Sequence, residues 1–242
     1  CEKHFAEAGD LARKHDVKVS FHPGQFTVLA SDTPDIVDRS IDEFEYHVNM
    51  ARWMGFGKSF QDGCKINVHI SGRQGPAGII KAIPRLSPEA RNLLTIENDE
   101  MGWGLESSLE LEKHCALVLD IHHHWVRTGE YIQANDDRVK RIIDSWRGVR
   151  PTMHYSYSRD EWLTPAYPNA EDMHKGFHDM ETLLSKGCKK QKLRAHSEML
   201  PNRAVNEWAL SFLPNLDIQV EAKMKNQAAE QLHSQAEELG LV

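Results

Sequence analysis

Side chains that can bind divalent metal ions follow short apolar stretches at six places in this chain. The clearest example is the apolar run 117–119, which leads directly into Asp120, with His123 three residues further on. In a strand followed by a loop, this carboxylate and this imidazole can point towards two neighbouring ions. Taken alone, the stretch is equally compatible with an apolar strand that happens to run into a polar loop.

Repetition of this pattern is what favours a metal centre. A single histidine at a strand end is more often a hydrogen-bonded structural residue than a ligand. Here six predicted strands each end in a residue of metal-ligand type. These residues are His22, His69, Glu97, Asp120, His154 and Glu221.

The types of ligand atom limit which metal ions can bind and which reaction they can support. Imidazole and carboxylate without thiolate suit Mn²⁺, Zn²⁺ or Fe²⁺ better than Ca²⁺ or Cu⁺. A carboxylate such as Glu97 can bridge two ions about 3.5–4 Å apart, which activates water for attack on a phosphate. The chain contains no P-loop, no G-x-G-x-x-G fingerprint and no Ser–His–Asp nucleophile. We therefore expect a metal-activated hydroxide as the nucleophile, two or three divalent ions, and no organic cofactor.

The elements that position these residues alternate between strand and helix. The predicted strands cover residues 17–21, 65–70, 93–96, 117–119, 151–156 and 216–221. Helical spacing of apolar residues between them predicts helices, including residues 109–116 and 173–184, and residues 155–168 are expected to form an irregular functional loop. Such alternation indicates a parallel sheet, either open or closed into a barrel.

The spread of candidate ligands over six strands favours the barrel. A barrel builds its active site from the C-terminal ends of many strands, whereas an open sheet gathers a ligand at one switch point. Six strands are two short of an eight-stranded barrel, and the chain opens at Cys1 inside an apparent helix. We therefore predict one α/β barrel domain over residues 1–242 that lacks its first two strands.

Composition is that of an ordinary globular protein, with 40% hydrophobic and 27% charged residues. No apolar run reaches the roughly 18 residues needed to span a bilayer. The four cysteines are scattered, which argues against a disulfide scaffold and favours a reducing cytoplasm. The net charge of −7 disfavours a nucleic-acid partner. Two or three bound divalent ions, however, would add roughly four to six positive charges in one cleft.

Four motifs resemble the signatures of the UV-damage endonucleases, which are TIM-barrel repair nucleases related to endonuclease IV. The motifs lie at residues 21–26, 97–99, 120–123 and 220–223, and the resemblance extends from about residue 5 to residue 232. It implies a TIM (β/α)8 barrel whose first two strands are absent here. It also implies an enzyme that uses manganese, with zinc as an alternative, and nicks damaged double-stranded DNA on the 5′ side of UV photoproducts. Abasic sites are a further candidate substrate. The resemblance favours a cytoplasmic protein, associated with the nucleoid if bacterial.

The resemblance also implies three metal sites and two catalytic residues, Glu97 and Glu221. The first site consists of His22, His69 and Glu97. Glu97 would bridge to the second site, which also has Asp120, His154 and Glu221. His123 and His196 would hold the third ion. Gln25 and Phe26 match a Gln-Tyr pair that family members insert into the duplex at the lesion. Phe26 keeps the stacking face of the tyrosine but lacks its hydroxyl group.

The chain departs from the family pattern at two points. Thr152 stands where well-known members carry a lysine, and the interval from His154 to His196 is longer than in those members. Glu198 is a candidate additional ligand of the third site. Two alternatives stay open: a sugar isomerase or epimerase on a similar barrel, which would use a general-base Lys or His, and a damage-binding protein that no longer cuts.

Overall fold

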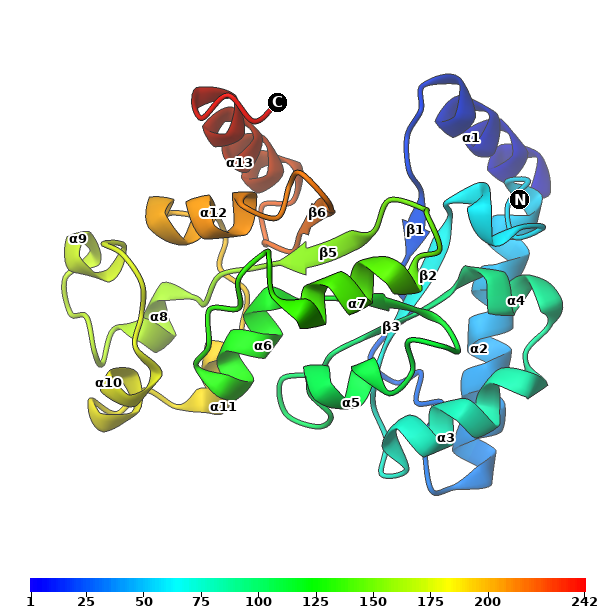
Figure 1. The fold of residues 1–242 in the computed structure, drawn as a ribbon, viewed down its shortest axis with the longest axis horizontal. Helices are drawn as coiled ribbons and strands as arrows, with labels where there is room; N and C mark the ends of the chain where they lie inside the picture. The colour runs from blue at the N-terminus through cyan, green and yellow to red at the C-terminus, as the bar shows by residue number, and fades with distance from the viewer. The chain divides into compact units, whose positions relative to one another are not determined.

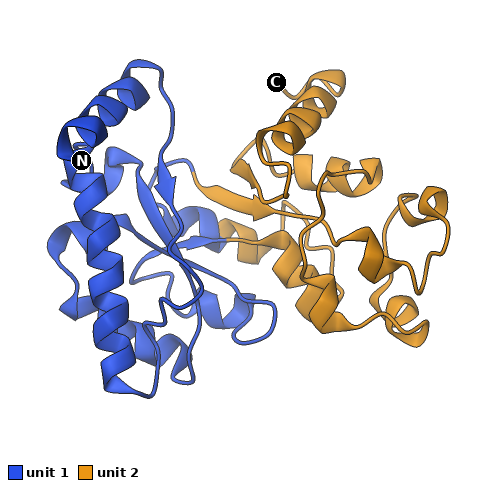
Figure 2. Ribbon diagram, turned by 180° about the vertical axis from the view of Figure 1, so that it is seen from behind, with its two compact units in different colours: residues 1–118, 141–150 blue, residues 119–140, 151–242 orange.

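Helices separate the six strands along the chain, as the apolar periodicity predicts, with one or more helices in each connection (Figure 1). The computed structural model describes residues 1–242, which group into two units (Figure 2). Unit 1 comprises Cys1–Val118 and Arg141–Arg150, and unit 2 comprises Leu119–Lys140 and Pro151–Val242. None of the helices combines the length and the apolar composition needed to cross a membrane.

All six predicted strands are present. They are β1 (Ser20–Phe21), β2 (Lys65–His69), β3 (Leu94–Glu97), β4 (Ala116–Val118), β5 (Thr152–Tyr155) and β6 (Asp217–Val220). Unit 1 contains a parallel sheet in the order β1-β2-β3-β4, and unit 2 contains the parallel pair β5-β6. Parallel pairing brings the C-terminal ends of neighbouring strands to the same edge, where the candidate ligands follow.

The strand register sets neighbouring candidate ligands beside each other. In β2 and β3, Asn67 pairs with Thr95, and His69 pairs with Glu97. Ile66 and Ile96 on the same strands are fully buried, so the register is fixed by the apolar side chains of the sheet. The pairing of the apolar residues therefore determines which polar residues meet at the strand ends.

Seven helical segments lie wholly within unit 1. They are α1 (Glu2–Lys14), α2 (Pro34–Trp53), α3 (Gly75–Ala82), α4 (Pro88–Leu93), α5 (Leu105–Leu109), η1 (Phe60–Asp62) and η2 (Ile83–Arg85). Helix α7 (Asp137–Ser145) begins in unit 2 and ends in unit 1. The buried face of α2 carries Ile41, Phe44 and Val48 at helical spacing, as the sequence predicts.

The predicted helix over residues 109–116 is wrong. Helix α5 ends at Leu109, and Ala116 already belongs to β4. Between them the chain forms turns, in which the His114 amide donates to the Leu111 carbonyl at 2.8 Å. Leu111 and Cys115 are buried from these turns, so their helix-like spacing reflects burial rather than a helix.

Unit 2 is built mostly from short helices. They are α6 (Ile121–Thr128), α8 (Asp160–Leu163), α9 (Ala170–Met173), α10 (Met180–Ser185), α11 (Lys190–Leu193), α12 (Arg203–Leu210) and α13 (Asn226–Glu238). The single helix predicted over 173–184 is two helices, α9 and α10. Gly176 between them has a φ of +78°, which no continuous right-handed helix accepts. The predicted irregular loop 155–168 contains α8.

A close backbone approach fixes the loops at the strand ends of unit 1. A Cβ atom on Gly72 would lie 2.4 Å from the carbonyl oxygen of Ala30, and Gly72 has a φ of +98°. The Gln74 amide donates to the Ala30 carbonyl at 3.0 Å. The indole nitrogen of Trp103 donates to the Gly72 carbonyl at 2.7 Å. Only glycine fits at position 72, which holds the segment after the Gln25–Phe26 turn against the loop after β2.

Candidate metal centre

In unit 1, three candidate ligands gather at the ends of adjacent strands. His22 follows β1, and His69 and Glu97 are the last residues of β2 and β3. The His22 Nε2 atom lies 3.3 Å from Glu97 Oε2, and the rings of His22 and His69 have centroids 5.1 Å apart. His69 also offers a ring nitrogen within 4.8 Å of a Glu97 oxygen. The strand-end positions predicted for these three residues agree with the structure.

Asn67 orients the Glu97 carboxylate, a role that the sequence reasoning missed. Its side-chain amide donates a short hydrogen bond to Glu97 Oε2. The Thr95 hydroxyl in turn donates to Asn67 Oδ1 at 3.0 Å. Asn67 and Thr95 are each two residues before a candidate ligand, so they lie on the same face of their strands as that ligand. Their polar side chains, at strand positions that are otherwise apolar, could have indicated this role from the sequence.

Burial of Glu97 makes a cation at this position favourable. The residue is 0% exposed, and transferring a carboxylate out of water costs several kcal/mol unless charge or hydrogen bonds compensate. Asn67 supplies a neutral amide, and His22 is charged only when protonated. A divalent ion would provide the missing positive charge. The imidazole and carboxylate donors of unit 1 therefore fit a metal ion such as Mn²⁺ or Zn²⁺.

Unit 2 contains a second ligand group, formed by Asp120, His154 and Glu221. Each offers one ligand atom within 4.8 Å of those of the other two. His154 Nδ1 lies 3.3 Å from a Glu221 oxygen, and the backbones of Asp120 and His154 form an isolated parallel bridge. Asp120 and His154 are almost fully buried. Two carboxylates and one imidazole, with Glu221 partly exposed, are again a donor set that suits a divalent ion.

Asp120 has a second, structural role because the predicted loop after it is a helix. Asp120 is the N-cap of α6, and its side chain accepts a hydrogen bond from the His123 amide at 2.7 Å. The cap places His123 on the first turn of the helix, where its Nδ1 lies 3.6 Å from Asp120 Oδ2. The Asp-x-x-His spacing thus corresponds to an N-capping arrangement that fixes both candidate ligands.

His123 and His196, the predicted ligands of a third ion, are neighbours in unit 2. Their ring centroids lie 6.5 Å apart, and His196 Nδ1 is 3.9 Å from a Glu221 oxygen. His196 is held by an isolated antiparallel bridge with Ser158. His196 belongs to none of the groups whose ligand atoms all lie within 4.8 Å of one another. Its assignment to a third metal stays a prediction.

His122 is engaged as a structural residue beside this group. The Ser158 hydroxyl donates to the Leu193 carbonyl at 2.6 Å, so it accepts from His122 Nε2 at 3.0 Å. The other ring nitrogen, Nδ1, then accepts from Ser156 at 2.8 Å. Burial, followed by the nearby His196 and His123 imidazoles, lowers the pKa of His122 well below its usual value. A neutral ring with both nitrogens occupied is not a ligand, although it stands out in the sequence.

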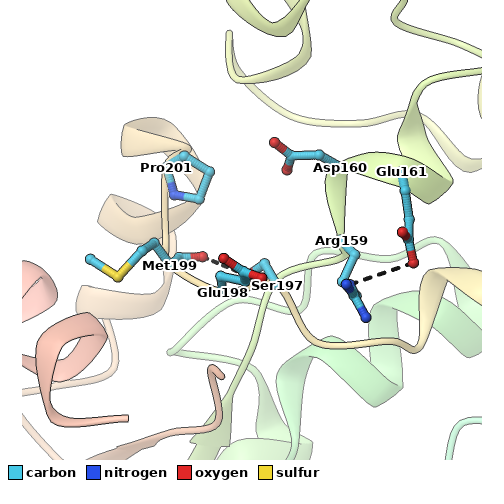
Figure 3. Close-up of a pocket in the computed structure, with 7 residues that line it drawn as sticks. All are labelled: Arg159, Asp160, Glu161, Ser197, Glu198, Met199 and Pro201. Atoms are coloured by element: carbon cyan, nitrogen blue, oxygen red, sulfur yellow. Dashed lines mark hydrogen bonds and ion pairs between the residues drawn. The ribbon is translucent and has the colours of Figure 1, made fainter. Parts of the chain in front are cut away.

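A pocket of about 340 Å³ in unit 2 opens close to His196 in the chain (Figure 3). It is lined by Arg159, Asp160, Glu161, Ser197, Glu198, Met199 and Pro201. The exposed Glu198, the candidate additional ligand, faces this pocket, and the Met224 amide donates to its carbonyl at 3.0 Å. Its role as a metal ligand stays a prediction.

The predicted DNA-contacting pair lies in a turn after β1. Gln25 and Phe26 are the central residues of this turn, which the Thr27 amide closes by donating to the Gly24 carbonyl at 3.0 Å. Phe26 is 84% exposed, unusual for so large an apolar side chain. The ring contributes little to the core of unit 1 and is available to stack on another molecule.

Comparison with known protein families gives a match over almost the whole chain. The model of the family described as UV-endonuclease UvdE matches residues 1–241. The chain belongs to this family. The resemblance inferred from the four motifs is thereby confirmed.

Individual UvdE relatives are considerably longer than this chain. The chain is 31% identical over 183 residues to the UV DNA damage endonuclease of Bacillus pumilus, an alignment that covers 71% of the chain and 55% of the relative. It is 28% identical over 243 residues to the UV-damage endonuclease of Schizosaccharomyces pombe, covering 96% of the chain and 36% of that protein. The chain thus spans about half or less of the length of these two relatives.

Solved structures share the fold of this UvdE family member. The crystal structure of SacUVDE matches with a TM-score of 0.76 at 22% identity, covering 100% of this chain and 72% of that one. Endonuclease IV from Thermus thermophilus matches with a TM-score of 0.63 at 13% identity, covering 96% of this chain and 81% of that one. Both are TIM-barrel-like, so the predicted fold class is confirmed. The strands of this chain form sheets of four and two strands rather than a closed barrel.

Proposed function

We propose that this protein is a metal-dependent repair endonuclease that nicks damaged double-stranded DNA on the 5′ side of UV photoproducts. The observation that carries the proposal is a set of carboxylates and imidazoles at parallel strand ends, with Glu97 and Asp120 fully buried, in a member of the UV-endonuclease family. Both relatives described above are named as endonucleases of UV damage. Abasic sites are included among the proposed substrates.

In the proposed chemistry, each of the two ligand groups binds one divalent ion. A divalent ion at such a site activates water and stabilises the charge that develops on a phosphate. His22, His69 and Glu97 hold one ion, with Asn67 keeping the Glu97 carboxylate in position. Asp120, His154 and Glu221 hold another, and Glu221 acts with Glu97 as a catalytic carboxylate. That Glu97 is shared by two ions stays a prediction. The third ion, bound by His123 and His196, is also a prediction. Manganese is the proposed metal, with zinc as the alternative.

A sugar isomerase or epimerase is the rival enzyme class, because similar barrels carry such metal sites. That reaction needs a general-base Lys or His beside a polyol pocket. The experiment that separates the two uses the intact protein with Mn²⁺. We expect nicking of UV-irradiated plasmid and no nicking of untreated plasmid. Aldose–ketose conversion without nicking would refute the endonuclease proposal.

Thr152 is the observation that favours a protein that binds damage without cutting it. It lies on β5 two residues before His154, so both side chains are on the same face of the strand. The family resemblance places a lysine at this position in well-known members, and Thr152 cannot supply its charge. The alternative predicts retention of UV-damaged DNA without cleavage, together with one bound metal equivalent or none.

The turn after β1 is proposed to recognise the lesion. A side chain that stacks into the duplex opens a step whose stacking the damage has already weakened, so damaged sites cost less to deform. The exposed ring of Phe26 and the adjacent Gln25 amide suit this role.

Replacing both Gln25 and Phe26 by alanine should lower the preference for damaged over intact duplex by roughly tenfold, because stacking contributes about 1–3 kcal/mol per base. Binding of UV-irradiated and untreated duplex, measured by fluorescence anisotropy, gives this ratio. Both residues are exposed, so the melting temperature should change little. A ratio equal to that of the wild type would refute the assignment.

Asn67→Leu should weaken the binding of Mn²⁺ by roughly 10- to 100-fold, the usual effect of losing a residue that orients a ligand. The replacement keeps the volume but removes the hydrogen bond that orients Glu97. Calorimetric titration of the metal-free protein measures the affinity.

Asn92→Leu is the matched control. Asn92 donates to the Gly57 carbonyl at 3.0 Å and precedes β3 rather than following it. Its loss should lower stability by about 1 kcal/mol without changing metal affinity. Equal metal affinity in both variants would show that Asn67 does not position Glu97.

The location of the protein is part of the proposal. All four cysteines are free, three of them buried, which is typical of a protein in a reducing compartment. Together with a DNA substrate this favours the cytoplasm, and the nucleoid if the protein is bacterial.

A further inference from the structure

Unit 2 contains a basic segment, residues 186–194, in a chain that is otherwise acidic. Five of its nine residues are Lys or Arg and none is Asp or Glu, whereas the whole chain has 29 basic and 36 acidic residues. The basic residues are Lys186, Lys189, Lys190, Lys192 and Arg194. The segment includes α11 and leads directly to His196.

Three of these lysines are exposed and form no ion pair. Lys186, Lys189 and Lys192 have no carboxylate oxygen within 4.0 Å. Other lysines of unit 2 do find carboxylates: Lys140 lies 2.7 Å from Asp137, and Lys175 lies 2.9 Å from Glu171. A lysine without a carboxylate in an acidic protein leaves its positive charge available to an external anion.

Aromatic rings support two of these lysines. The Nζ atom of Lys192 lies 4.5 Å from the centre of the Trp162 ring, and that of Lys186 lies 5.8 Å from the Tyr167 ring. Cation–π contacts restrict a long side chain while leaving its hydrogen-bond donors open. Trp162 and Tyr167 lie in the aromatic stretch for which the sequence predicts a functional loop.

The backbone of the segment is anchored beside the ligand group of unit 2. Buried Leu193 accepts a hydrogen bond from Ser158 through its carbonyl, at 2.6 Å. The Arg159 amide donates to the Ala195 carbonyl at 2.9 Å, next to His196. Lys190 is not free, because its Nζ donates to the Arg127 carbonyl at the end of α6. These bonds fix α11 in place without using the three exposed lysines.

We propose that Lys186, Lys189 and Lys192 bind phosphates of the DNA duplex that flanks the site of incision. The inference rests on the proposed function, since it adds a backbone-binding surface to the same site. Phosphate contacts by lysine carry no sequence information but position the protein on the duplex. They would offset the repulsion between DNA and a protein of net charge −7. A purely solvated lysine surface is the alternative outcome of the test.

The test is the salt dependence of binding to an undamaged duplex, which needs no cleavage. Each phosphate neutralised contributes about 0.9 to the slope of log affinity against log salt. Replacing Lys186, Lys189 and Lys192 together by glutamine should lower the slope by about 2–3 and weaken binding at least ~10-fold. Intact and UV-irradiated duplex should be affected equally, so the damage preference stays the same. Replacement of the same lysines by arginine should retain the slope.

The matched control replaces three lysines elsewhere by glutamine: Lys14, Lys58 and Lys113. These are also exposed and without carboxylate partners, and each precedes a strand of unit 1 rather than following one. The change in net charge is identical, so a general charge effect would lower both slopes equally and would overturn the proposal. An unchanged slope in the first variant would overturn it as well.

Failure of this surface and failure of the proposed function are distinguishable. If the triple glutamine variant cut UV-irradiated DNA normally and kept the wild-type salt slope, the proposed role of the three lysines would be wrong and the proposed nuclease function would stand. If loss of Lys186, Lys189 and Lys192 lowered the slope and the control replacement did not, the lysines would bind phosphate. If the wild-type protein then cut no DNA, only the proposed nuclease function would be wrong.

Discussion

Glu97→Gln should reduce strand cleavage by roughly a thousandfold or more, while binding of UV-damaged duplex stays within a few-fold of wild type. Glutamine keeps the shape of Glu97 and can still contact Asn67, but it lacks the negative charge that a divalent ion needs. Since Glu97 is fully buried, its side chain contributes nothing to the exposed surface that DNA would contact. Single-turnover cleavage and equilibrium binding, measured on the same duplex, separate the two effects.

Glu112→Gln provides a control with the same loss of charge. Glu112 pairs with Arg141 at 2.7 Å and precedes β4, away from the strand ends that carry the ligands. Its replacement should leave the cleavage rate within about twofold, because exposed ion pairs contribute little. Cleavage by Glu97→Gln at a rate near that of Glu112→Gln would remove Glu97 from the proposed mechanism.

Asp120→Asn should also reduce cleavage by about a thousandfold, without loss of stability. The carboxylate of Asp120 is both a proposed metal ligand and the cap of α6. Asparagine is as good an N-cap as aspartate, so the hydrogen bond from the His123 amide can be retained, but the charge is lost. Metal affinity and activity should fall together, whereas the melting temperature of the metal-free protein should stay the same.

Asp120→Ala separates the two roles of this residue. Alanine removes both the ligand and the cap, so the metal-free protein should lose about 1 kcal/mol of stability in addition to its activity. Urea unfolding of the metal-free variants measures this difference. If Asp120→Asn retained cleavage, Asp120 would be only a helix cap.

Strand positions could be predicted from the sequence because short apolar runs in a parallel sheet are nearly continuous. The runs around Ile66 and Ile96 are buried on both faces, and their ends agree with β2 and β3. Helix boundaries were harder to predict. The apolar spacing around Leu111 results from turns whose apolar side chains are buried, and Gly176 breaks the helix predicted across it.

The candidate ligands could be placed at strand ends, but their supporting contacts could not. The contact of Asn67 with Glu97 depends on the register between two strands that are far apart in the sequence. Conversely, the sequence predicted a loop after Asp120, from which Asp120 and His123 would both reach metal ions. Asp120 instead caps a helix there, and His122 is held by two serines.

Metal chemistry and DNA recognition make different demands on the chain. Four of the proposed ligands, Glu97, Asp120, His123 and His154, are buried, which keeps their positions defined before a metal binds. The proposed DNA contacts, Phe26 and the three lysines, are exposed and make few bonds within the protein. Substitutions at the two kinds of position should therefore affect cutting and binding separately.

The most direct test of the central claim uses an end-labelled duplex that contains one UV photoproduct. The intact protein should cut the damaged strand at a single phosphodiester bond 5′ to the photoproduct when Mn²⁺ is present. A chelator should abolish the cut, and the undamaged duplex should remain whole. Retention of the damaged duplex without any cut, at every metal tested, would contradict the account.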